Sequence, residues 1–347
     1  MNFQIKVYAV NILTIQEFIE ISKDLPIIDV RTPDEFSNGH ITNAINIPLF
    51  SNEERAIVGT KYKQESRDTA IAKALEYIAE KTDYYLDELQ KLVKSQEICI
   101  YCWRGGFRSE GMGYLFQTVG KKVYRLSGGY KAYRNFVLDT FKPEYNLIVI
   151  GGMTGSGKTE ILGEIGKTSE QMLDLEGLAN HKGSAFGALG QDDQPTTQQF
   201  ENDLAAQLNE FDIKQNIWLE DESRMIGRVK IPDNLFTQIR SSSVIKIEVS
   251  KDNRINRLIK DYAKFNKPDL INSINNISRR LGGLNSKLAI ESIEKEDYHK
   301  ATDIILDYYD KAYTYGLSKR EGQTIIPIKL KEDDPQKTAR KLIGLIE

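Results

Sequence analysis

The sequence is poor in cysteine, histidine and tryptophan. Among 347 residues there are two cysteines, three histidines and two tryptophans. Two cysteines and three scattered histidines cannot supply the four ligands of a structural zinc site. The C-x-x-C spacing of Cys99 and Cys102 would suit a redox pair. Cys99, however, lies in an apolar segment, where a thiol usually serves as a small buried hydrophobe.

Long apolar runs and excess positive charge are also absent. No run approaches the roughly 18 residues of a membrane span, and residues 1–6 lack the charged start and apolar block of a signal peptide. We therefore expect a cytoplasmic protein without membrane contacts. The net charge of −3 gives no overall attraction to nucleic acid. Any RNA partner must then be held by local basic patches, and no DNA partner is expected.

Apolar strands alternate with helical segments along the chain, which predicts an α/β protein with parallel sheets. The predicted strands are residues 27–30, 98–101, 123–126, 146–150, 217–219 and 244–249. A helix is predicted over residues 68–94, and residues 252–310 are mostly helical and basic. Pro143 marks a linker, so the predicted domains are residues 1–142 and 143–347.

A glycine-rich loop begins at Cys102, directly after a predicted strand. Successive backbone N–H groups in such a turn form an anion-binding concavity, and a following helix N-terminus favours the thiolate. The sequence therefore predicts Cys102 as a catalytic nucleophile; a buried cysteine beside a tight turn is the alternative. Arg108 is expected to donate to loop carbonyls or to an oxyanion. The predicted anion-binding residues are Trp103, Arg104, Gly105, Gly106, Phe107 and Arg108.

A second loop matches the phosphate-binding pattern G-x-x-x-x-G-K-[ST], again between an apolar strand and a helix. Its glycines let the backbone wrap a phosphate, and Lys158 adds a positive charge. The predicted diphosphate-binding residues are Gly152, Thr154, Gly155, Ser156, Gly157, Lys158 and Thr159. Thr159 is expected to reach a magnesium ion, with an acidic partner at the end of a neighbouring strand. Glu220 and Asp221 are the candidates, and Asp221 is the predicted ligand; a solvated acidic loop is the alternative.

Residues 28–36, 39–41 and 44–48, together with Leu126-Ser127-Gly128-Gly129, closely resemble signatures of the rhodanese family. The resemblance covers residues 3–140 and places Cys102 at the position of the persulfide-forming cysteine. The N-terminal domain is therefore expected to be a rhodanese-like parallel-sheet domain, and the C-terminal one a P-loop NTPase-like α/β domain. The resemblance implies structural roles for Asp29, Arg31, Glu35 and His40.

The thiol loop departs from the usual rhodanese pattern in length. Five residues separate Cys102 from Arg108, whereas the common sulfur-transferring loop has four. A longer loop makes a wider anion pocket, which would suit a selenium-containing anion. Dual-specificity phosphatases share this length. A sulfurtransferase or phosphatase fused to a small-molecule kinase is therefore the alternative function.

The combination of both loops with residues 49–55, 174–187 and 222–224 resembles the tRNA 2-selenouridine synthase family. The resemblance implies a tRNA-modifying transferase acting on the wobble 2-thiouridine at the anticodon. Geranyl diphosphate would first alkylate the sulfur, and selenium from selenophosphate would then replace the geranylthio group. It implies tRNA as partner, dependence on a selenophosphate supply, and magnesium as a cofactor of the diphosphate site.

The remaining candidates are polar residues near the phosphate loop or in the basic helical region. Each has a plain alternative, an irregular loop or a solvated charged face. The candidate substrate or tRNA contacts are His181, Lys182, Ser223, Arg224, Arg228, Arg279 and Arg280. Arg254, Arg257 and Lys260 extend this basic set to the preceding helix, as expected if a local patch binds tRNA phosphates.

Overall fold

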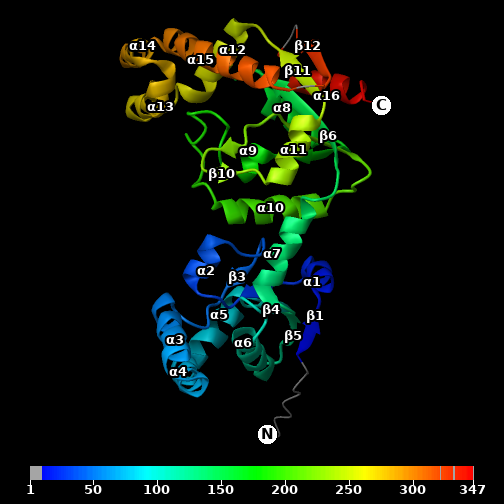
Figure 1. The fold of residues 1–347 in the computed structure, drawn as a ribbon, viewed down its shortest axis with the longest axis vertical. Helices are drawn as coiled ribbons and strands as arrows, with labels where there is room; N and C mark the ends of the chain where they lie inside the picture. Colours follow the sequence, from blue (N-terminus) through cyan, green and yellow to red (C-terminus); the bar gives the residue numbers. More distant parts are fainter. Residues whose placement is uncertain (1–9, 321, 331–332, 347) are drawn as a thin grey trace. The chain divides into compact units, whose positions relative to one another are not determined.

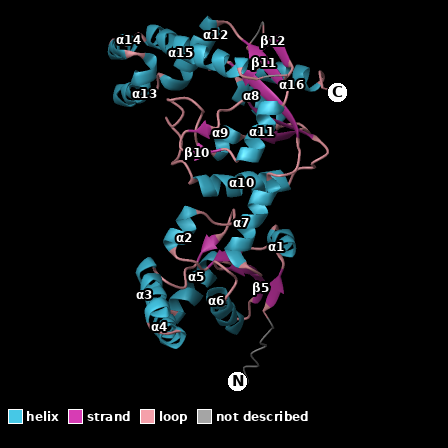
Figure 2. Ribbon diagram, viewed as in Figure 1, coloured by secondary structure: helices cyan, strands magenta, loops and turns pink. Residues whose placement is uncertain are grey.

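The computed structural model describes residues 10–320, 322–330 and 333–346. The chain divides into two compact units, Met1–Thr140 and Phe141–Glu347. Both contain a sheet covered by helices, as predicted (Figure 1; Figure 2). Within the described ranges no helix is long and apolar enough to cross a membrane.

The first unit contains a five-stranded, fully parallel sheet of order β1-β5-β4-β2-β3. Its strands are β1 Asn11–Leu13, β2 Ile27–Asp29, β3 Ile45–Asn46, β4 Glu97–Tyr101 and β5 Lys122–Leu126. The strand β4 lies at the centre, so its apolar residues are buried on both faces. Cys102 directly follows this central strand and is therefore at the carboxyl edge of the sheet.

The helices of the first unit are α1 Ile15–Ser22, α2 Pro33–Asn38, α3 Asn52–Gln64, α4 Arg67–Glu80, α5 Thr82–Leu92, α6 Phe107–Thr118 and α7 Gly129–Thr140. The single helix predicted over 68–94 is two helices, because Lys81 has a non-helical ψ of 7°. The helix α2 begins with a capping box. The Thr32 hydroxyl accepts from the Glu35 N–H, and the Glu35 carboxylate accepts from the Thr32 N–H at 3.1 Å.

The second unit contains a five-stranded parallel sheet of order β12-β11-β6-β8-β7 and a small antiparallel pair, β10-β9. Its strands are β6 Asn146–Gly152, β7 Gln171–Leu173, β8 Asn216–Glu220, β9 Met225–Ile226, β10 Val229–Lys230, β11 Val244–Glu248 and β12 Ile325–Lys329. The central strand β6 ends in the phosphate loop, and the neighbouring strand β8 ends at Glu220. Parallel pairing thus brings both ends to one edge of the sheet.

The helices of the second unit are α8 Lys158–Ile165, α9 Leu175–Leu178, α10 Thr197–Asn209, α11 Asp233–Ser241, α12 Lys251–Tyr262, α13 Lys267–Leu281, α14 Gly283–Glu294, α15 Tyr298–Ser318 and α16 Pro335–Ile343. One apolar core joins β6, β8 and β11 to α8 and α16. A separate core joins α13, α14 and α15, and Phe186 packs into it. This helical group stands beside the sheet (Figure 1) and corresponds to the predicted basic helical region.

Candidate functional site

The thiol loop connects β4 to α6. Gly105 has a φ of 65°, in the left-handed region that favours glycine, and Gly106 caps the helix that starts at Phe107. The backbone N–H groups of Arg104, Gly105 and Gly106 have no hydrogen-bond acceptor within the described part of the chain. These free donors, next to a helix N-terminus, have the arrangement expected of an anion-binding concavity, and anion binding by this loop stays a prediction.

The thiol of Cys102 is held inside this loop. Its Sγ lies 3.2 Å from the Ser109 hydroxyl and 3.8 Å from the Gly106 carbonyl, and the residue is 3% exposed. Ser109 is fully buried on the first turn of α6 and was not identified from the sequence. The Ser109 hydroxyl also lies 3.2 Å from the Gly106 carbonyl, so Ser109 contacts both the sulfur and the loop backbone and orients the thiol.

Two residues that follow the loop in sequence fix its shape. A side chain at Gly129 would place Cβ 2.3 Å from the Cys102 carbonyl oxygen and 2.4 Å from the Gly105 nitrogen. Only glycine permits this close approach of two backbones. Arg125 on β5 donates from Nη1 to the Gly105 carbonyl at 3.0 Å. Arg125 therefore takes the carbonyl-binding role that the sequence analysis assigned to Arg108.

Arg108 points to a different partner. Its guanidinium forms a bidentate salt bridge with Glu35, with distances of 2.5 and 3.1 Å. This geometry differs from the predicted contact with loop carbonyls, because Nη1 and Nη2 each donate to the Glu35 carboxylate; contact with an oxyanion stays a prediction. The pair instead ties α6 to α2. It also lowers the pKa of Glu35 against the opposing effect of burial.

Several rhodanese-signature residues form a buried network behind the loop. The Arg31 guanidinium donates to both carboxylate oxygens of Asp29, at 2.6 to 3.0 Å, and to the Gly39 carbonyl. The Tyr101 hydroxyl donates to Asp29 at 2.6 Å, and the ring of Tyr130 lies 3.8 Å from the Arg31 guanidinium. Such a saturated network supports the structural interpretation of Asp29 and Arg31.

The two cysteines lie in very different surroundings. Cys99 is fully buried within β4, and burial raises the pKa of its thiol to about 12. It therefore remains protonated and inert at neutral pH. By contrast, Cys102 is the first residue after β4 and begins the thiol loop. Trp103 and Phe107, at 39% and 46% exposure, border that loop with apolar surface.

The phosphate loop has the backbone geometry of an anion cradle. Gly155 and Gly157 have φ values of 80° and 82°, and Gly157 caps α8. The Lys158 ammonium donates to the Gly152 carbonyl at 3.1 Å, across the mouth of the loop. The Ser156 hydroxyl is buried without a hydrogen-bond partner within the described residues. These donors converge at the N-terminus of α8, where a phosphate is stabilised by the helix dipole.

Two arginines of α12 support this loop from behind. Arg254 donates to the Thr154 carbonyl at 3.2 Å and forms a bidentate pair with Asp310. Arg257 donates to the Gly155 carbonyl at 2.8 Å and pairs with Asp333. Arg254 is 3% exposed, so its proposed contact with tRNA phosphates is wrong. Both side chains instead hold the loop carbonyls in place.

Three glutamates face the loop from adjacent elements. Glu176 on α9 accepts from the Thr159 hydroxyl at 3.2 Å. Glu220, at the end of β8, is 1% exposed, and neither of its carboxylate oxygens has a hydrogen-bond partner within the described residues. Burial raises its pKa well above the usual range, and burial with the nearby Glu176 raises the pKa of Glu222 to about 8. Lys158 is the cation that lowers the pKa of all three carboxyl groups, against the larger effect of burial.

Asp221 is placed differently from its prediction. Its carboxylate is paired with Arg320, whose guanidinium is fully buried, and lies 3.5 Å from Nη1 of Arg240. Two arginines therefore already neutralise Asp221, which argues against its predicted role as a magnesium ligand. The other candidate at this position, Glu220, is the buried carboxylate that has no hydrogen-bond partner within the described residues.

A cleft of about 1390 Å³ opens in front of the phosphate loop. Most of the predicted site residues in this unit line it; they are Gly152, Thr154, Gly155, Ser156, Gly157, Lys158, Thr159, His181, Lys182, Asp221, Ser223, Arg224, Arg228 and Arg280. Arg279 is exposed on α13 but does not line the cleft. The fold thus brings predicted residues from separate segments of the chain to one cleft. Nothing in the sequence distinguished Arg280 from the adjacent Arg279.

His181 is a buried base in the wall of this cleft. It is 9% exposed, and its Nδ1 has no hydrogen-bond partner within the described residues. Burial lowers its pKa, so the ring is neutral at pH 7. Gly187 provides the space for it, because a Cβ there would lie 2.9 Å from Nδ1. The segment from Asp174 to Gly187 is therefore packed against the cleft instead of forming a loose surface loop.

The fold and these two loops define a two-domain enzyme, a rhodanese-like domain joined to a P-loop domain. Residues 14–136 match the rhodanese-like domain model, and residues 145–333 match the model of the tRNA 2-selenouridine synthase AAA domain. The chain belongs to the tRNA 2-selenouridine synthase family, whose members are transferases.

Named relatives match along most of the chain. The tRNA 2-selenouridine synthase of Shewanella frigidimarina is 33% identical over 86% of this chain and 90% of its own length. The one from Pseudomonas syringae pv. syringae is 35% identical over 84% of this chain and 88% of its own. A solved N-terminal domain of a putative ATP/GTP binding protein from Clostridium difficile is 43% identical, covering 37% of this chain and 99% of that one, with a TM-score of 0.34.

Proposed function

We propose that this enzyme converts the wobble 2-thiouridine of tRNA to 2-selenouridine by two successive group transfers. The observation that supports this most is the presence of two built anion sites in one chain of this family. One is a phosphate loop suited to a diphosphate, and the other is a thiol loop with free N–H donors. Each site suits one phosphorylated co-substrate, geranyl diphosphate or selenophosphate.

The first transfer alkylates sulfur. The sulfur of 2-thiouridine attacks C1 of geranyl diphosphate, the C1–O bond breaks, and diphosphate departs with the bonding electrons while N3 loses its proton. The loop from Gly152 to Thr159 is proposed to bind the diphosphate. Lys158 stabilises the charge that develops on the departing oxygen, and such preorganised charges typically contribute about 10²–10³ in rate.

A magnesium ion fits the carboxylates near Thr159, although no three metal-ligating side chains converge within the described residues. Magnesium usually takes only one or two carboxylates and completes its shell with water and phosphate oxygens. The unpartnered oxygens of Glu220 and the Thr159–Glu176 pair provide such a partial set. Bound there, the ion would neutralise charge on a leaving diphosphate. We propose Glu220 and Glu176 for this role in place of Asp221.

The second transfer exchanges selenium for sulfur. The selenium of selenophosphate adds to C2 of the pyrimidine, geranylthiolate leaves with the C2–S electrons, and water then cleaves the P–Se bond to release phosphate. Alkylation makes this possible because it converts sulfur into a good leaving group. The free N–H groups of the thiol loop are proposed to bind the selenophosphate oxygens. Cys102, oriented by Ser109, is proposed to act in this step.

The tRNA is proposed to approach the cleft of the second unit. Arg228 and Arg280 are exposed cations on the cleft wall without an ion-pair partner in the described chain, whereas exposed Arg224 is paired with Asp233. Local cations are required because the chain carries a net charge of −3. The wobble base must leave its stack to be modified, so it is expected to be splayed out and held by an aromatic or arginine side chain.

Two single variants test the division of labour in a reconstituted reaction with 2-thiouridine tRNA, geranyl diphosphate and selenophosphate. Nucleosides are measured by mass spectrometry. Lys158→Ala should suppress S-geranylation by about 10²–10³, yet retain selenation of tRNA supplied already geranylated. Cys102→Ala should abolish 2-selenouridine and accumulate the geranylated nucleoside. Cys99→Ala is the matched control and should retain both steps.

Normal selenation by Cys102→Ala would remove the thiol from the mechanism. Unchanged geranylation by Lys158→Ala would place the diphosphate elsewhere. Loss of activity in folded Cys99→Ala would indicate a two-cysteine mechanism instead.

A further inference from the structure

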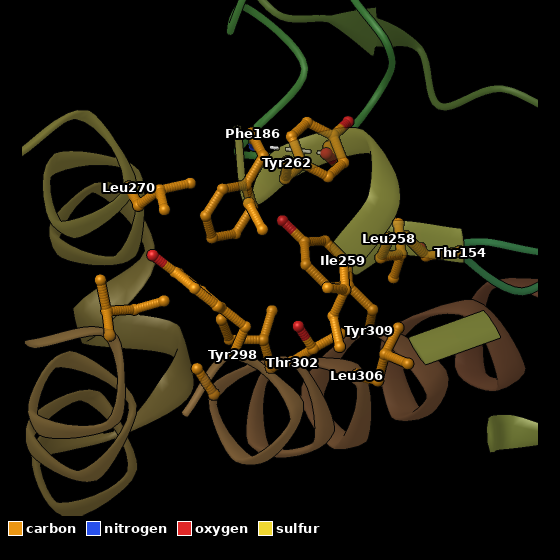
Figure 3. Close-up of a pocket in the computed structure, with 15 residues that line it drawn as sticks. Thr154, Phe186, Leu258, Ile259, Tyr262, Leu270, Tyr298, Thr302, Leu306 and Tyr309 are labelled. Atoms are coloured by element: carbon orange, nitrogen blue, oxygen red, sulfur yellow. Dashed lines mark hydrogen bonds between the residues drawn. The ribbon is translucent and has the colours of Figure 1, made fainter. Parts of the chain in front are cut away.

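An apolar pocket lies directly beside the phosphate loop. It has a volume of about 50 Å³ and is enclosed by side chains from α12, α13, α14 and α15 and by Phe186 (Figure 3). Thr154, a residue of the phosphate loop, forms one end of the pocket, and Leu270 and Tyr298 lie at the opposite end. No residue of this pocket was singled out from the sequence as apolar binding surface.

The pocket wall is mostly hydrocarbon, and two of its phenol hydroxyls are hydrogen-bonded to the segment at residues 184–185. The Tyr309 hydroxyl accepts from the Ala185 N–H at 2.7 Å, and the Tyr262 hydroxyl is hydrogen-bonded to Ser184. Burial raises the pKa of both phenols to about 12, so neither carries a charge at neutral pH. The residues that line the pocket include no charged side chain, so a charged ligand would lose its hydration without a charged partner, whereas removing an alkyl group from water is favourable.

The pocket borders the cleft that contains the diphosphate-binding residues. Thr154, Ser184, Leu258, Tyr262 and Tyr309 line both spaces. Leu258 and Tyr262 therefore offer apolar surface between the loop and the pocket to the tail of a ligand whose anionic head lies in the loop. A ligand that consists of diphosphate alone would make no favourable contact with an apolar wall of this kind.

The size of the pocket indicates how much of a tail it holds. At roughly 12 Å³ per water-sized group, a volume of about 50 Å³ accommodates on the order of four heavy atoms. That matches the branched, dimethyl-substituted end of one isoprene unit. The remainder of the chain would then lie against the shared wall leading back to Thr154.

We propose that this pocket binds the distal end of the hydrocarbon chain of an allylic diphosphate and selects its length. The inference rests on the proposed function, in which the phosphate loop binds the diphosphate group of this co-substrate. The pocket is assigned to the hydrocarbon tail of the same molecule. A chain one isoprene unit shorter leaves the pocket empty, and one unit longer meets Leu270 and Tyr298 at its closed end. Thr302 on α15 lies between these ends and controls the depth.

The test measures kcat/KM for sulfur alkylation of 2-thiouridine tRNA with the C5, C10 and C15 allylic diphosphates. Thr302→Phe fills the pocket and should lower the C10 to C5 ratio about tenfold or more, the range that small changes in apolar pockets produce. Leu270→Ala extends the pocket and should raise the C15 to C10 ratio several-fold. The matched controls are Thr314→Phe on exposed α15 surface and Leu284→Ala, a leucine that is 73% exposed. Both should keep wild-type ratios.

Binding without tRNA gives a second readout. By calorimetry, inorganic diphosphate should bind wild type and Thr302→Phe within twofold of each other, while the C10 diphosphate should bind the variant at least tenfold more weakly. If the wild-type protein binds and transfers the C10 group but both variants retain its selectivity and affinity, the pocket assignment is overturned and the proposed function stands. If the wild-type protein neither binds nor transfers it, both fail together.

Discussion

Single side chains in this protein take roles that neighbouring residues of the same type do not share. Cys99 and Cys102 are three positions apart, yet one is sealed in a strand and the other is in contact with Ser109. Glu220 and Asp221 are adjacent, yet only Asp221 is neutralised by arginines. Residue type and motif therefore limit the candidate functional residues to a few positions. The contacts that each side chain makes in the fold then distinguish between these candidates.

His181 should make folding stability depend on pH. Burial lowers its folded-state pKa below the ordinary 6.5, so the unfolded chain binds a proton more readily. The stabilising contribution of neutral His181 is complete above pH 6.5 and is lost as the pH falls below that value, by at most about 1.4 kcal/mol per pH unit. In chemical denaturation from pH 8 to pH 5.5, His181→Gln should lose stability less steeply than wild type.

The control for this prediction is His299→Gln, which removes an exposed histidine from α15. It should follow the wild-type profile. Equal slopes for wild type and His181→Gln would show that the imidazole does not titrate as a buried group.

At the scale of elements, α13 presents two adjacent arginines to different surroundings. Arg280 lines the cleft, whereas Arg279 is exposed outside it. We therefore expect Arg280→Ala to weaken tRNA binding and to make its dependence on salt shallower by about 0.7–0.9 in the log–log slope, the contribution of one phosphate contact. Arg279→Ala, with the same loss of charge, should leave the slope unchanged. Fluorescence titrations at several salt concentrations measure both, and equal slopes for the two variants would refute the assignment.

The sequence predicted the central strands of both sheets better than the edge strands. Strands β2, β4, β5, β6, β8 and β11 were all expected, because their buried apolar residues form recognisable runs. The edge strands β1 and β12 were missed, because exposed residues interrupt their apolar pattern. Strands β3 and β7 are only two and three residues long, too short for any periodicity to be visible.

The sites show a similar division. Both loops were predicted because glycine spacing is local in sequence, and backbone geometry follows from it. Glu35, Asp310 and Arg320, which pair with Arg108, Arg254 and Asp221 respectively, lie between 56 and 99 positions away, so this pairing depends on tertiary packing. For the same reason, the sequence did not predict the roles of Arg125 and Ser109 or the presence of the apolar pocket. No local pattern sets them apart from ordinary core residues.

For the molecule as a whole, the two chemical steps are assigned to separate compact units. Under this assignment, tRNA that one protein molecule has geranylated can be released and enter another. Lys158→Ala and Cys102→Ala should each fail to make 2-selenouridine alone, and their equimolar mixture should restore it at reduced rate. Mass spectrometry of the tRNA nucleosides gives the answer. The double variant Lys158→Ala/Cys102→Ala mixed with either single variant is the control and should stay inactive.

Absence of product from the mixture of single variants would mean that both residues must act within one chain. Product from a mixture that contains the double variant would mean that one of the two residues is dispensable.

Glu35 links two parts of the first unit, since the same carboxylate caps the first turn of α2 and pairs with Arg108 on α6. Neither contact can open without weakening the other. The amide hydrogens at the start of α2 and α6 should consequently exchange with solvent as a single cooperative unit, although 73 positions separate Glu35 from Arg108. An anion that orders the thiol loop would then slow exchange in α2, a segment that it never touches.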